Sequence, residues 1–347
     1  MHLQRFDPAA GDTLAGACYE IYLAGQPIDD PYGPPKSAGF FTGWLTVGWD
    51  ADPQEVWLAR DAAGVLRGWY LLGLPQQENQ HLAGLWPTVH PDHRRAGLGT
   101  TLVRHAAGQA RKSGRTVLNG WARVGSPGSA FASAIGARPG LLSTGRVLRL
   151  TKIPAGRLAA LRAQAEPSAR GYALLCWDGP APDDLVSGLA VVHASGMADL
   201  PRDPGQEAEH WDEARVRLVE DRSATQGFRW YTVGAQSLAS GELAGFTQVA
   251  VDPATPAWGF QLLTAVTPPH RGHRLGLLIK VAMLELLSGR EPQLTQIIAG
   301  NADVNEHMIA INAELGFEVL DHWQSWELDV QRALALEEPV TAARRAR

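Results

Sequence analysis

The sequence predicts an α+β fold with two copies of one domain in tandem. The length and an internal repeat carry this prediction. The chain has 347 residues, whereas one domain usually takes roughly 100–200 residues. A segment that starts at Val89 recurs 177 positions later (266 minus 89), at Val266, which is about half the chain. In both halves, hairpin-like runs precede the segment and a helical pattern follows it.

The repeated segment begins where a strand is expected to end. The first copy reads VHPDHRRAGLG from Val89 to Gly99, and the second reads VTPPHRGHRLG from Val266 to Gly276. Valine, proline, histidine, arginine, leucine and the last glycine fall in register. A repeat this long indicates two domains rather than a solenoid of short repeats.

Strand and helix patterns surround each copy at matching places. The expected strands are 56–59, 69–72, 82–89 and 116–122 in the first half, and 172–177, 229–234, 245–251, 258–266 and 294–299 in the second. Each copy leads into a helix, with one apolar face at 98–110 and an almost wholly apolar stretch at 275–287. A short second helix should end before Gly136 in the first half and before Gly316 in the second.

These patterns suggest the domain limits. We expect an N-terminal domain over residues 1–153, a linker over 154–170 and a C-terminal domain over 171–332. The linker is rich in alanine, arginine and proline, and it has helical potential at 157–165. The remaining segment, 333–347, is expected to be a mobile tail.

Composition excludes several classes of protein. Hydrophobic residues make up 45% of the chain and charged residues 19%, which is not the composition of a disordered chain. A net charge of −5 argues against a nucleic-acid partner. No apolar run approaches the ~18 residues of a membrane span, and the N-terminus lacks a signal-peptide pattern. With two cysteines, Cys18 and Cys176, no disulfide framework is expected, so we anticipate a cytoplasmic protein.

A strand, an Arg/Gly-rich turn and a helix together form an anion site in outline. The first helical turn leaves backbone N–H groups without partners, and the helix dipole favours negative charge there. Glycine lets the backbone approach a diphosphate closely. Arg94 and Arg95 can add charge-assisted hydrogen bonds. The spacing matches neither Gly-x-x-x-x-Gly-Lys nor Gly-x-Gly-x-x-Gly, so the common nucleotide loops are excluded.

The pattern Arg94-x-x-Gly97-x-Gly99 resembles the pyrophosphate loop of the GNAT superfamily of acyl-CoA-dependent N-acyltransferases. The tandem arrangement resembles mycothiol synthase and related bacterial acetyltransferases. This resemblance implies two domains, each with a mixed, mostly antiparallel sheet flanked by helices. It also implies acetyl-CoA or another acyl-CoA as co-substrate. The acceptor would be a small amine, an antibiotic or its precursor among the options, acetylated by direct acyl transfer by a monomer or homodimer.

The resemblance assigns the cofactor to the two loops. It also points to two asparagines in the segment Asn301–Phe317, which looks like the strand-to-helix segment of the family. The cofactor candidates are Val89, Arg94, Arg95, Ala96, Gly97, Leu98, Gly99, Thr100, Val266, Arg271, Gly272, His273, Arg274, Leu275, Gly276, Asn301 and Asn305. For Asn305 a helix N-cap is an equal alternative, and for Asn301 the cap is favoured.

The second loop departs from the family pattern at one position. Arg274 stands where the first loop has Gly97. A Cβ disfavours the left-handed backbone. Either the backbone avoids positive φ, or the site is weakened, or the arginine gains a phosphate contact.

The catalytic residues are not apparent from the sequence. The family's carboxylate corresponds to Gly84 and Gln261, and its tyrosine acid to Ala132 and Asn312. Weak substitutes, each more often a surface residue, are Glu78, His81, His193 and His210. His93 and His270, just before the loop arginines, are expected to shape the turn or to touch phosphate. An oxyanion donor could come from a backbone N–H near Val89 or Val266 if the strand bulges there.

Other site types find little support. No His/Cys cluster has zinc spacing, so no metal is expected, and no Gly-x-Ser-x-Gly elbow occurs. The tryptophans are expected in the core, although those at 43–50 are candidates for the wall of an acceptor pocket. Because the usual acid and base are missing, the alternative is an acyl-CoA-binding protein with one or both domains catalytically silent.

Overall fold

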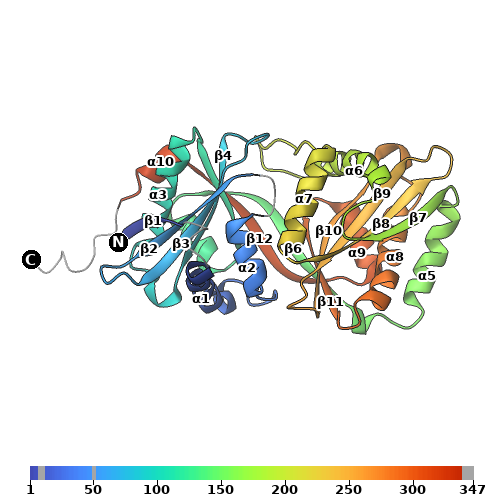
Figure 1. Ribbon diagram of the computed structural model, residues 1–347, viewed down its shortest axis with the longest axis horizontal. Coiled ribbons are helices and arrows are strands. Elements are labelled where there is room, and N and C mark those ends of the chain that lie inside the picture. Colours follow the sequence, from blue (N-terminus) through green and yellow to red (C-terminus); the bar gives the residue numbers. More distant parts are fainter. Residues whose placement is uncertain (7–11, 49–51, 338–347) are drawn as a thin grey trace, which may run out of the picture. The chain divides into compact units, whose positions relative to one another are not determined.

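The computed structural model describes residues 1–6, 12–48 and 52–337 and divides into two compact units (Figure 1). Among the described residues, unit 1 comprises those up to Gly48, Asp52–Leu142 and those from His322 onward, and unit 2 comprises Ser143–Asp321. Each unit is a mixed, mostly antiparallel sheet flanked by helices, as the sequence predicts.

Unit 1 has the strand order β1-β2-β3-β4-β5-β12. Its strands are β1 (His2–Arg5), β2 (Gln54–Arg60), β3 (Leu66–Gly73), β4 (Leu82–Val89), β5 (Val117–Arg123) and most of β12 (Glu318–Asp329). Its helices are α1 (Asp12–Asp29), α2 (Ala38–Thr46), α3 (Leu98–Lys112), α4 (Pro127–Ala134) and α10 (Val330–Leu334).

Unit 2 has the strand order β6-β11-β10-β9-β8-β7. Its strands are most of β6 (Arg138–Arg149), then β7 (Tyr172–Asp178), β8 (Arg229–Ser237), β9 (Leu243–Val251), β10 (Trp258–Val266) and β11 (Gln296–Ala302). Its helices are α5 (Arg157–Ala165), α6 (Val186–Asp199), α7 (Glu213–Thr225), α8 (Leu275–Arg290) and α9 (Glu306–Leu315).

In each unit, two parallel strands separate next to the repeated loop. β4 pairs with β5 only from Leu82 to Gly84, and β10 pairs with β11 only from Trp258 to Phe260. Beyond these points β4 and β10 continue on their antiparallel partners as far as Val89 and Val266. This separation leaves backbone groups open beside the loop.

The two units do not coincide with the expected domain limits. Most of β6 belongs to unit 2 although it precedes residue 153, and most of β12 belongs to unit 1 although it lies near the end of the chain. Residues 143–149 of β6 pair with β11 in unit 2, whereas residues 323–329 of β12 pair with β5 in unit 1. The last strand of unit 1 therefore comes from the end of the chain. A boundary at residue 153 assigns both strands to the wrong unit.

The segment expected as a linker is part of unit 2. Residues 157–165 form α5, as their helical potential indicates. Leu161 and Ala165 are buried in the same core as α8, and Arg162 donates hydrogen bonds to Glu285 on α8. The tail at 333–347 starts in α10, and residues 338–347 lie outside the described part of the chain.

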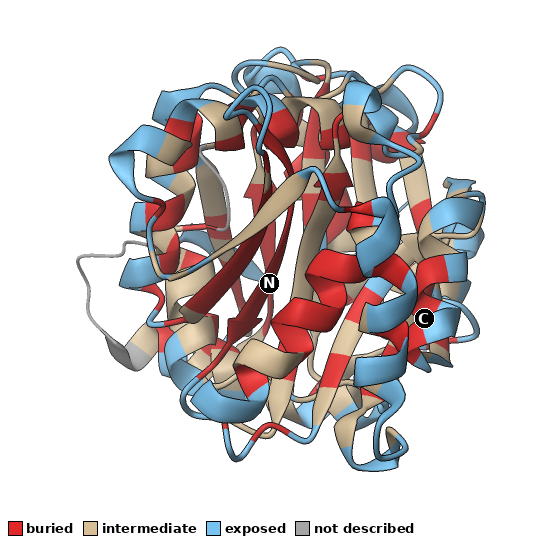
Figure 2. Cartoon of the chain, turned by 90° about the vertical axis from the view of Figure 1, so that its right-hand side faces the viewer, coloured by how far each residue is buried: buried red, intermediate tan, exposed pale blue. Residues whose placement is uncertain are grey.

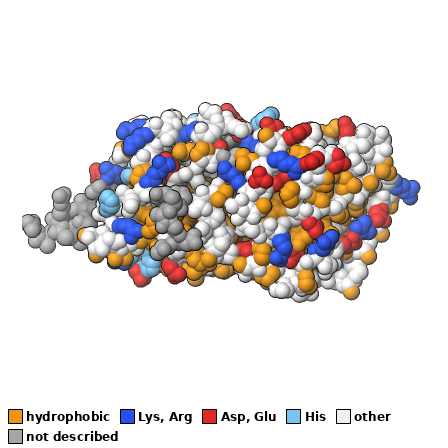
Figure 3. Space-filling view, in the orientation of Figure 1, with side chains coloured by type: hydrophobic (Ala, Val, Ile, Leu, Met, Phe, Trp, Pro, Cys, Tyr) orange, Lys and Arg blue, Asp and Glu red, His pale blue; other side chains and the backbone are white. Residues whose placement is uncertain are grey.

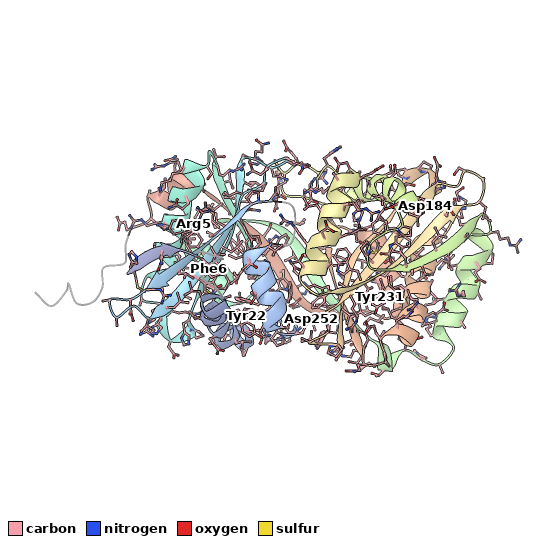
Figure 4. All side chains as sticks on the ribbon, in the orientation of Figure 1. Arg5, Phe6, Tyr22, Asp184, Tyr231 and Asp252 are labelled. Atoms are coloured by element: carbon pink, nitrogen blue, oxygen red, sulfur yellow. The ribbon has the colours of Figure 1, made fainter. Side chains whose placement is uncertain are left out.

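The cores explain why the two loop helices are placed firmly. α3 buries its apolar face against the sheet of unit 1. α8 buries ten of its residues, as its almost wholly apolar sequence predicts. All nine residues of β9 are buried (buried residues are red in Figure 2). Ala244, Val249 and Val251 belong to the same core as α8, whereas Leu243 and Phe246 belong to a core with α6. At the C-terminal end of α8, Tyr231 (labelled in Figure 4) donates a hydrogen bond of 2.5 Å to Glu291.

Candidate functional site

The two repeated loops follow the same backbone path with different residues. In the first loop, Arg95 (φ 62°) and Gly97 (φ 85°) adopt the left-handed region. In the second loop the residues at the same positions are Gly272 (φ 82°) and Arg274 (φ 54°). Each loop thus has one glycine and one arginine at its two left-handed positions, in opposite order. Of the alternatives for Arg274, avoidance of positive φ is therefore wrong: the residue accepts the left-handed conformation.

The helices that follow the loops begin without a side-chain cap. Neither Gly97 at the start of α3 nor Arg274 at the start of α8 makes a capping hydrogen bond. By contrast, Ser126 caps α4 and Asn305 caps α9. The uncapped first turns present backbone N–H groups to an anion.

One arginine of each loop braces the fold. Arg94 donates through Nε to the Val89 carbonyl (3.0 Å) and forms a bidentate pair with Asp29 at the end of α1 (2.9 and 2.6 Å). Arg271 repeats this arrangement, with Nε on the Val266 carbonyl (3.1 Å) and an ion pair to Asp199 at the end of α6. Both guanidinium groups are engaged by the protein, so these contacts do not support the expected phosphate role of Arg94.

The other loop arginines differ between the units. Arg95 is exposed, and within the described part of the chain the structure shows no hydrogen bond or ion pair for it. Arg274 pairs with Glu314 on α9 (2.8 Å). Arg95 is therefore available to an anion, whereas Arg274 must first leave a carboxylate.

A cavity of about 730 Å³ opens beside the second loop. It lies between the loop, the end of β10, the end of α6 and the exposed side of α9. Its lining includes Val266, His270, Arg271, Gly272, Arg274, Leu275, Gly276, Asn305 and Met308. This volume falls in the range of small-molecule sites. Most of the predicted residues of the second loop therefore share one cavity.

The side chain that faces the last glycine of the loop differs between the units. A Cβ on Gly99 would lie 3.1 Å from the ring of Phe131 on α4, whereas one on Gly276 would lie 3.0 Å from the tip of the smaller Ile311 on α9. Phe131 packs against the core of unit 1. A separate cavity of about 320 Å³ in unit 1 is lined from α4 and β12 and does not include the loop.

The two asparagines have different roles. Asn305 accepts a hydrogen bond from the Met308 N–H (3.2 Å), so it is a helix N-cap that also lines the cavity. The favoured reading of Asn301 as a cap is wrong, because it lies inside β11 and accepts a hydrogen bond from Asn312 (2.7 Å). A neighbouring strand and helix thereby become linked through two amides.

The strand before the second loop carries a β-bulge. The register of β10 with β9 shifts between Gln261 and Thr264, whereas β4 pairs with β3 from Gly84 to Val89 without a shift. The bulge lies before Val266, one of the two strand ends that the sequence analysis considered, and the pairing of β4 with β3 shows none before the other, Val89. The amide of Gln261 donates to the Gln248 carbonyl (2.7 Å) and holds the bulge rather than acting as a base.

The substitute acids and bases lie apart from the loops. Glu78 and His81 lie in the turn before β4, and His210 is exposed. His193 is buried instead: it stacks on Trp211 (centroids 4.0 Å apart), and burial, with a contribution from Arg215, lowers its pKa to about 3. At neutral pH the His193 imidazole is therefore neutral and cannot act as a general acid.

The remaining predicted residues mainly shape the loops. His93 lies 2.8 Å from an Arg67 nitrogen, and His270 lies 3.0 Å from the Tyr172 hydroxyl. His273 contacts the Ser168 carbonyl. Leu98 and Leu275 are buried, Ala96 is exposed and Thr100 is half-buried at the start of α3. The sequence did not point to Asp199, Thr264, His307 or Glu314, which also line the cavity. Their spacing from the repeat carries no signal.

Neither a metal site nor a membrane-spanning helix occurs among the described residues. No group of three His, Cys, Asp or Glu side chains is arranged to hold a metal ion. No helix over the described ranges is long and apolar enough to cross a membrane. Acidic and basic side chains are interspersed over the face seen in Figure 3.

Comparison with known proteins agrees with this geometry. Residues 17–126 match the acetyltransferase (GNAT) family. A tandem GNAT protein from the clavulanic acid biosynthesis pathway, solved without AcCoA, is 28% identical over 95% of this chain and 98% of its own, with a TM-score of 0.78. The chain thus holds a GNAT acetyltransferase domain over residues 17–126 and has the fold of a tandem GNAT protein. No curated protein sequence matches it.

Two further solved structures share the fold of this chain. A GCN5-related N-acetyltransferase from Sphaerobacter thermophilus is 17% identical, with a TM-score of 0.65 over 95% of both chains. A glucosamine N-acetyltransferase region of a fungal multi-domain β-N-acetylglucosaminidase is 14% identical, with a TM-score of 0.66 over 94% of this chain and 38% of its own. At these identities the likeness is one of fold.

Proposed function

We propose that the protein is an acetyl-CoA-dependent N-acetyltransferase that acetylates a small amine, with the acyl-CoA held by unit 2. The cavity at the second loop carries this proposal. It joins an uncapped helix N-terminus, an exposed glycine loop and a bulged strand in one open space. A diphosphate fits the helix terminus, and an extended arm fits the gap between β10 and β11.

The chain's own residues have defined roles in this proposal. The first-turn amides of α8 would hold the diphosphate, and Arg274 would turn from Glu314 toward it. Backbone groups freed at the β10 bulge would face the acyl end. Bound acetyl-CoA would supply an activated thioester carbonyl to the amine.

The acceptor amine must be uncharged to react. Removing the proton from an amine with a pKa near 10.4 costs about 4–5 kcal/mol at pH 7. Gln261 and Asn312 occupy the expected base and acid positions, and the amides of both donate hydrogen bonds inside the protein. An acceptor with a lower pKa therefore suits this site better. The likeness to a protein of the clavulanic acid pathway supports an antibiotic or its precursor.

The second candidate function is acyl-CoA binding without turnover. The amides at positions 261 and 312 favour it, because neither can exchange a proton as a carboxyl or phenol does. Incubation with acetyl-CoA and a panel of amines separates the two candidates. Amine-dependent release of the CoA thiol supports the transferase, whereas tight CoA binding without release across the panel supports the binding protein.

CoA binding can be assigned to one unit by placing a negative charge near one loop at a time, which should repel the diphosphate. Asn305→Asp keeps the helix cap, since aspartate caps as well as asparagine, but puts a negative charge into the cavity. We expect about a tenfold or greater loss of CoA affinity by calorimetry, equivalent to ~1.4 kcal/mol. Thr100→Asp adds the same charge to the first turn of α3 and should change the affinity little. If Thr100→Asp alone weakens binding, the cofactor belongs to unit 1, and if neither does, the loop assignment is wrong.

A further inference from the structure

Three aromatic rings of unit 1 surround the amine of one lysine. The Lys36 Nζ lies 5.3 Å from the ring centre of Tyr22, 5.4 Å from Trp44 and 5.9 Å from Phe40. Tyr22 (labelled in Figure 4) belongs to α1, the other two rings belong to α2, and Lys36 lies in the loop between these helices. We call the three rings the aromatic box. All three are half-buried, so the box also has a face toward solvent.

The box is held in shape by the core beneath it. Phe41 is fully buried, and its ring centre lies 5.2 Å from Tyr22 and 5.9 Å from Trp44. Trp44 also meets the buried Trp69 edge-on, at 6.0 Å. Rings fixed in this way need little ordering when a cation enters between them.

Hydrogen bonds join the loop that carries Lys36 to α1. The Tyr22 hydroxyl accepts a hydrogen bond from the Lys36 N–H (2.9 Å), and the Tyr19 hydroxyl donates one to the Lys36 carbonyl (2.9 Å). The Ser37 side chain then caps α2 through the Phe40 N–H (3.1 Å). These contacts fix the backbone of Lys36, while the three rings surround the amine of its side chain.

The charge around the box suits a cation. The carboxyl group of Asp30 acts electrostatically on Lys36 and on Tyr22. Asp30 accepts a hydrogen bond from the Gly33 N–H (3.3 Å), which holds it in the loop. Burial lowers the pKa of Lys36, and Asp30 opposes this shift. No ion pair joins Lys36 to another described residue, so the ammonium group in the box exchanges part of its hydration for ring faces.

We propose that the aromatic box is a binding site for a small organic ammonium ion, and that Lys36 occupies it as an internal competitor. Aromatic faces with one nearby carboxylate recognise alkylammonium and quaternary ammonium groups. Lys36 can leave for the ligand to enter, since no hydrogen bond or ion pair to another described residue holds its side chain there. This site needs no acyl-CoA, so it stands apart from the transferase proposal.

If Lys36 competes for the box, removing its amine should raise the affinity of the box for an outside ammonium ion. A site that its own chain fills about nine-tenths of the time binds an outside ligand about tenfold more weakly. By calorimetry, Lys36→Gln should bind tetramethylammonium about tenfold more tightly than the wild type. Adding Trp44→Leu to Lys36→Gln should remove this binding. Lys152→Gln, at a lysine paired with Glu318 in unit 2, is the matched control and should behave as the wild type.

A second measurement uses a chain without any substitution. The sequence has four lysines, at positions 36, 112, 152 and 280, so carbon-13 methylation of the amines gives few signals. The Lys36 methyl signal should be shifted upfield by the rings and should return toward its usual position as tetramethylammonium is added. Equal affinity of wild type and Lys36→Gln, or a Lys36 signal that the ligand does not move, would overturn the proposal. Neither result bears on CoA binding.

Discussion

At the scale of single residues, backbone strain sits at a different position in each loop. Arg95 in unit 1 and Arg274 in unit 2 both adopt positive φ, next to a glycine that does so without strain. A left-handed conformation costs a residue with a Cβ roughly 1–2 kcal/mol. Both loops nevertheless keep the same path, which shows that the surrounding packing determines the loop conformation.

A substitution at Gly97 tests this strain. Gly97→Ala should destabilise the protein by roughly 1–2 kcal/mol, because alanine must adopt φ near 85° there. Gly108→Ala lies in the same helix, and a Cβ there meets nothing within 4 Å. It should stabilise the helix by about 0.5–1 kcal/mol. Urea denaturation of the two variants should therefore show shifts of opposite sign.

A buried lysine makes stability depend on pH. Lys280 is 3% exposed inside α8, and burial lowers its pKa to about 7. The unfolded pKa is near 10.4, so between these values the unfolded state binds more protons. The free energy of unfolding should then rise with pH by up to ~1.4 kcal/mol per unit. Below pH 7 the folded protein bears the full cost of the buried ammonium.

The variant Lys280→Met isolates this effect. It should be more stable than the wild type at pH 7, because it replaces a buried charge with an apolar chain of similar length. Its advantage should shrink as the pH rises from about 7 to 10 in urea denaturation. A difference that stays constant over this range would contradict the assigned pKa.

At the scale of elements, an ion pair joins each loop to the C-terminal end of a helix, α1 in unit 1 and α6 in unit 2. The pairs Arg94–Asp29 and Arg271–Asp199 span 65 and 72 residues of sequence. Each fixes the end of a strand to the end of a helix. The first pair is the more buried: Arg94 is 20% exposed and Arg271 is 46% exposed.

A double-mutant cycle measures this brace. Arg94→Ala combined with Asp29→Ala should give a coupling energy of about 1 kcal/mol, from a bidentate and partly buried pair. The same cycle on Arg271 and Asp199 should give a few tenths of a kcal/mol, because the pair is more exposed. Chemical denaturation of the four variants in each cycle supplies the numbers. Absence of coupling in the first cycle would contradict the structural role of Arg94 and leave its guanidinium available for the phosphate contact that the sequence predicts.

At the scale of the whole molecule, unit 1 is not a continuous piece of chain. Unit 1 takes residues 323–329 of β12 as the neighbour of β5. Leu328, Val330 and Ala333 are buried in its core. A domain cut at residue 153 would leave β5 with an open edge and its core with a gap.

A fragment tests this dependence. Residues 1–153 expressed alone should unfold at lower urea concentration than the full chain, or aggregate, because the edge of β5 is bare. A peptide of residues 318–337 should restore part of the stability. Circular dichroism and size exclusion follow both changes. A fragment as stable as the full chain would show that β12 is dispensable to unit 1.

The sequence by itself determined the repeat, the strands before each loop and the helix after it, because these follow from local periodicity and turn residues. It also led to the GNAT resemblance and, among the residues that line the cavity, to those of the second loop and to Asn305. It did not reveal that Arg94 and Arg271 are braces, nor that β12 completes unit 1. Nor did it tell that the second loop opens onto a cavity lined also from α6 and α9. Only the tertiary structure decided these points, because each depends on side chains or strands distant in sequence whose contact no local pattern encodes.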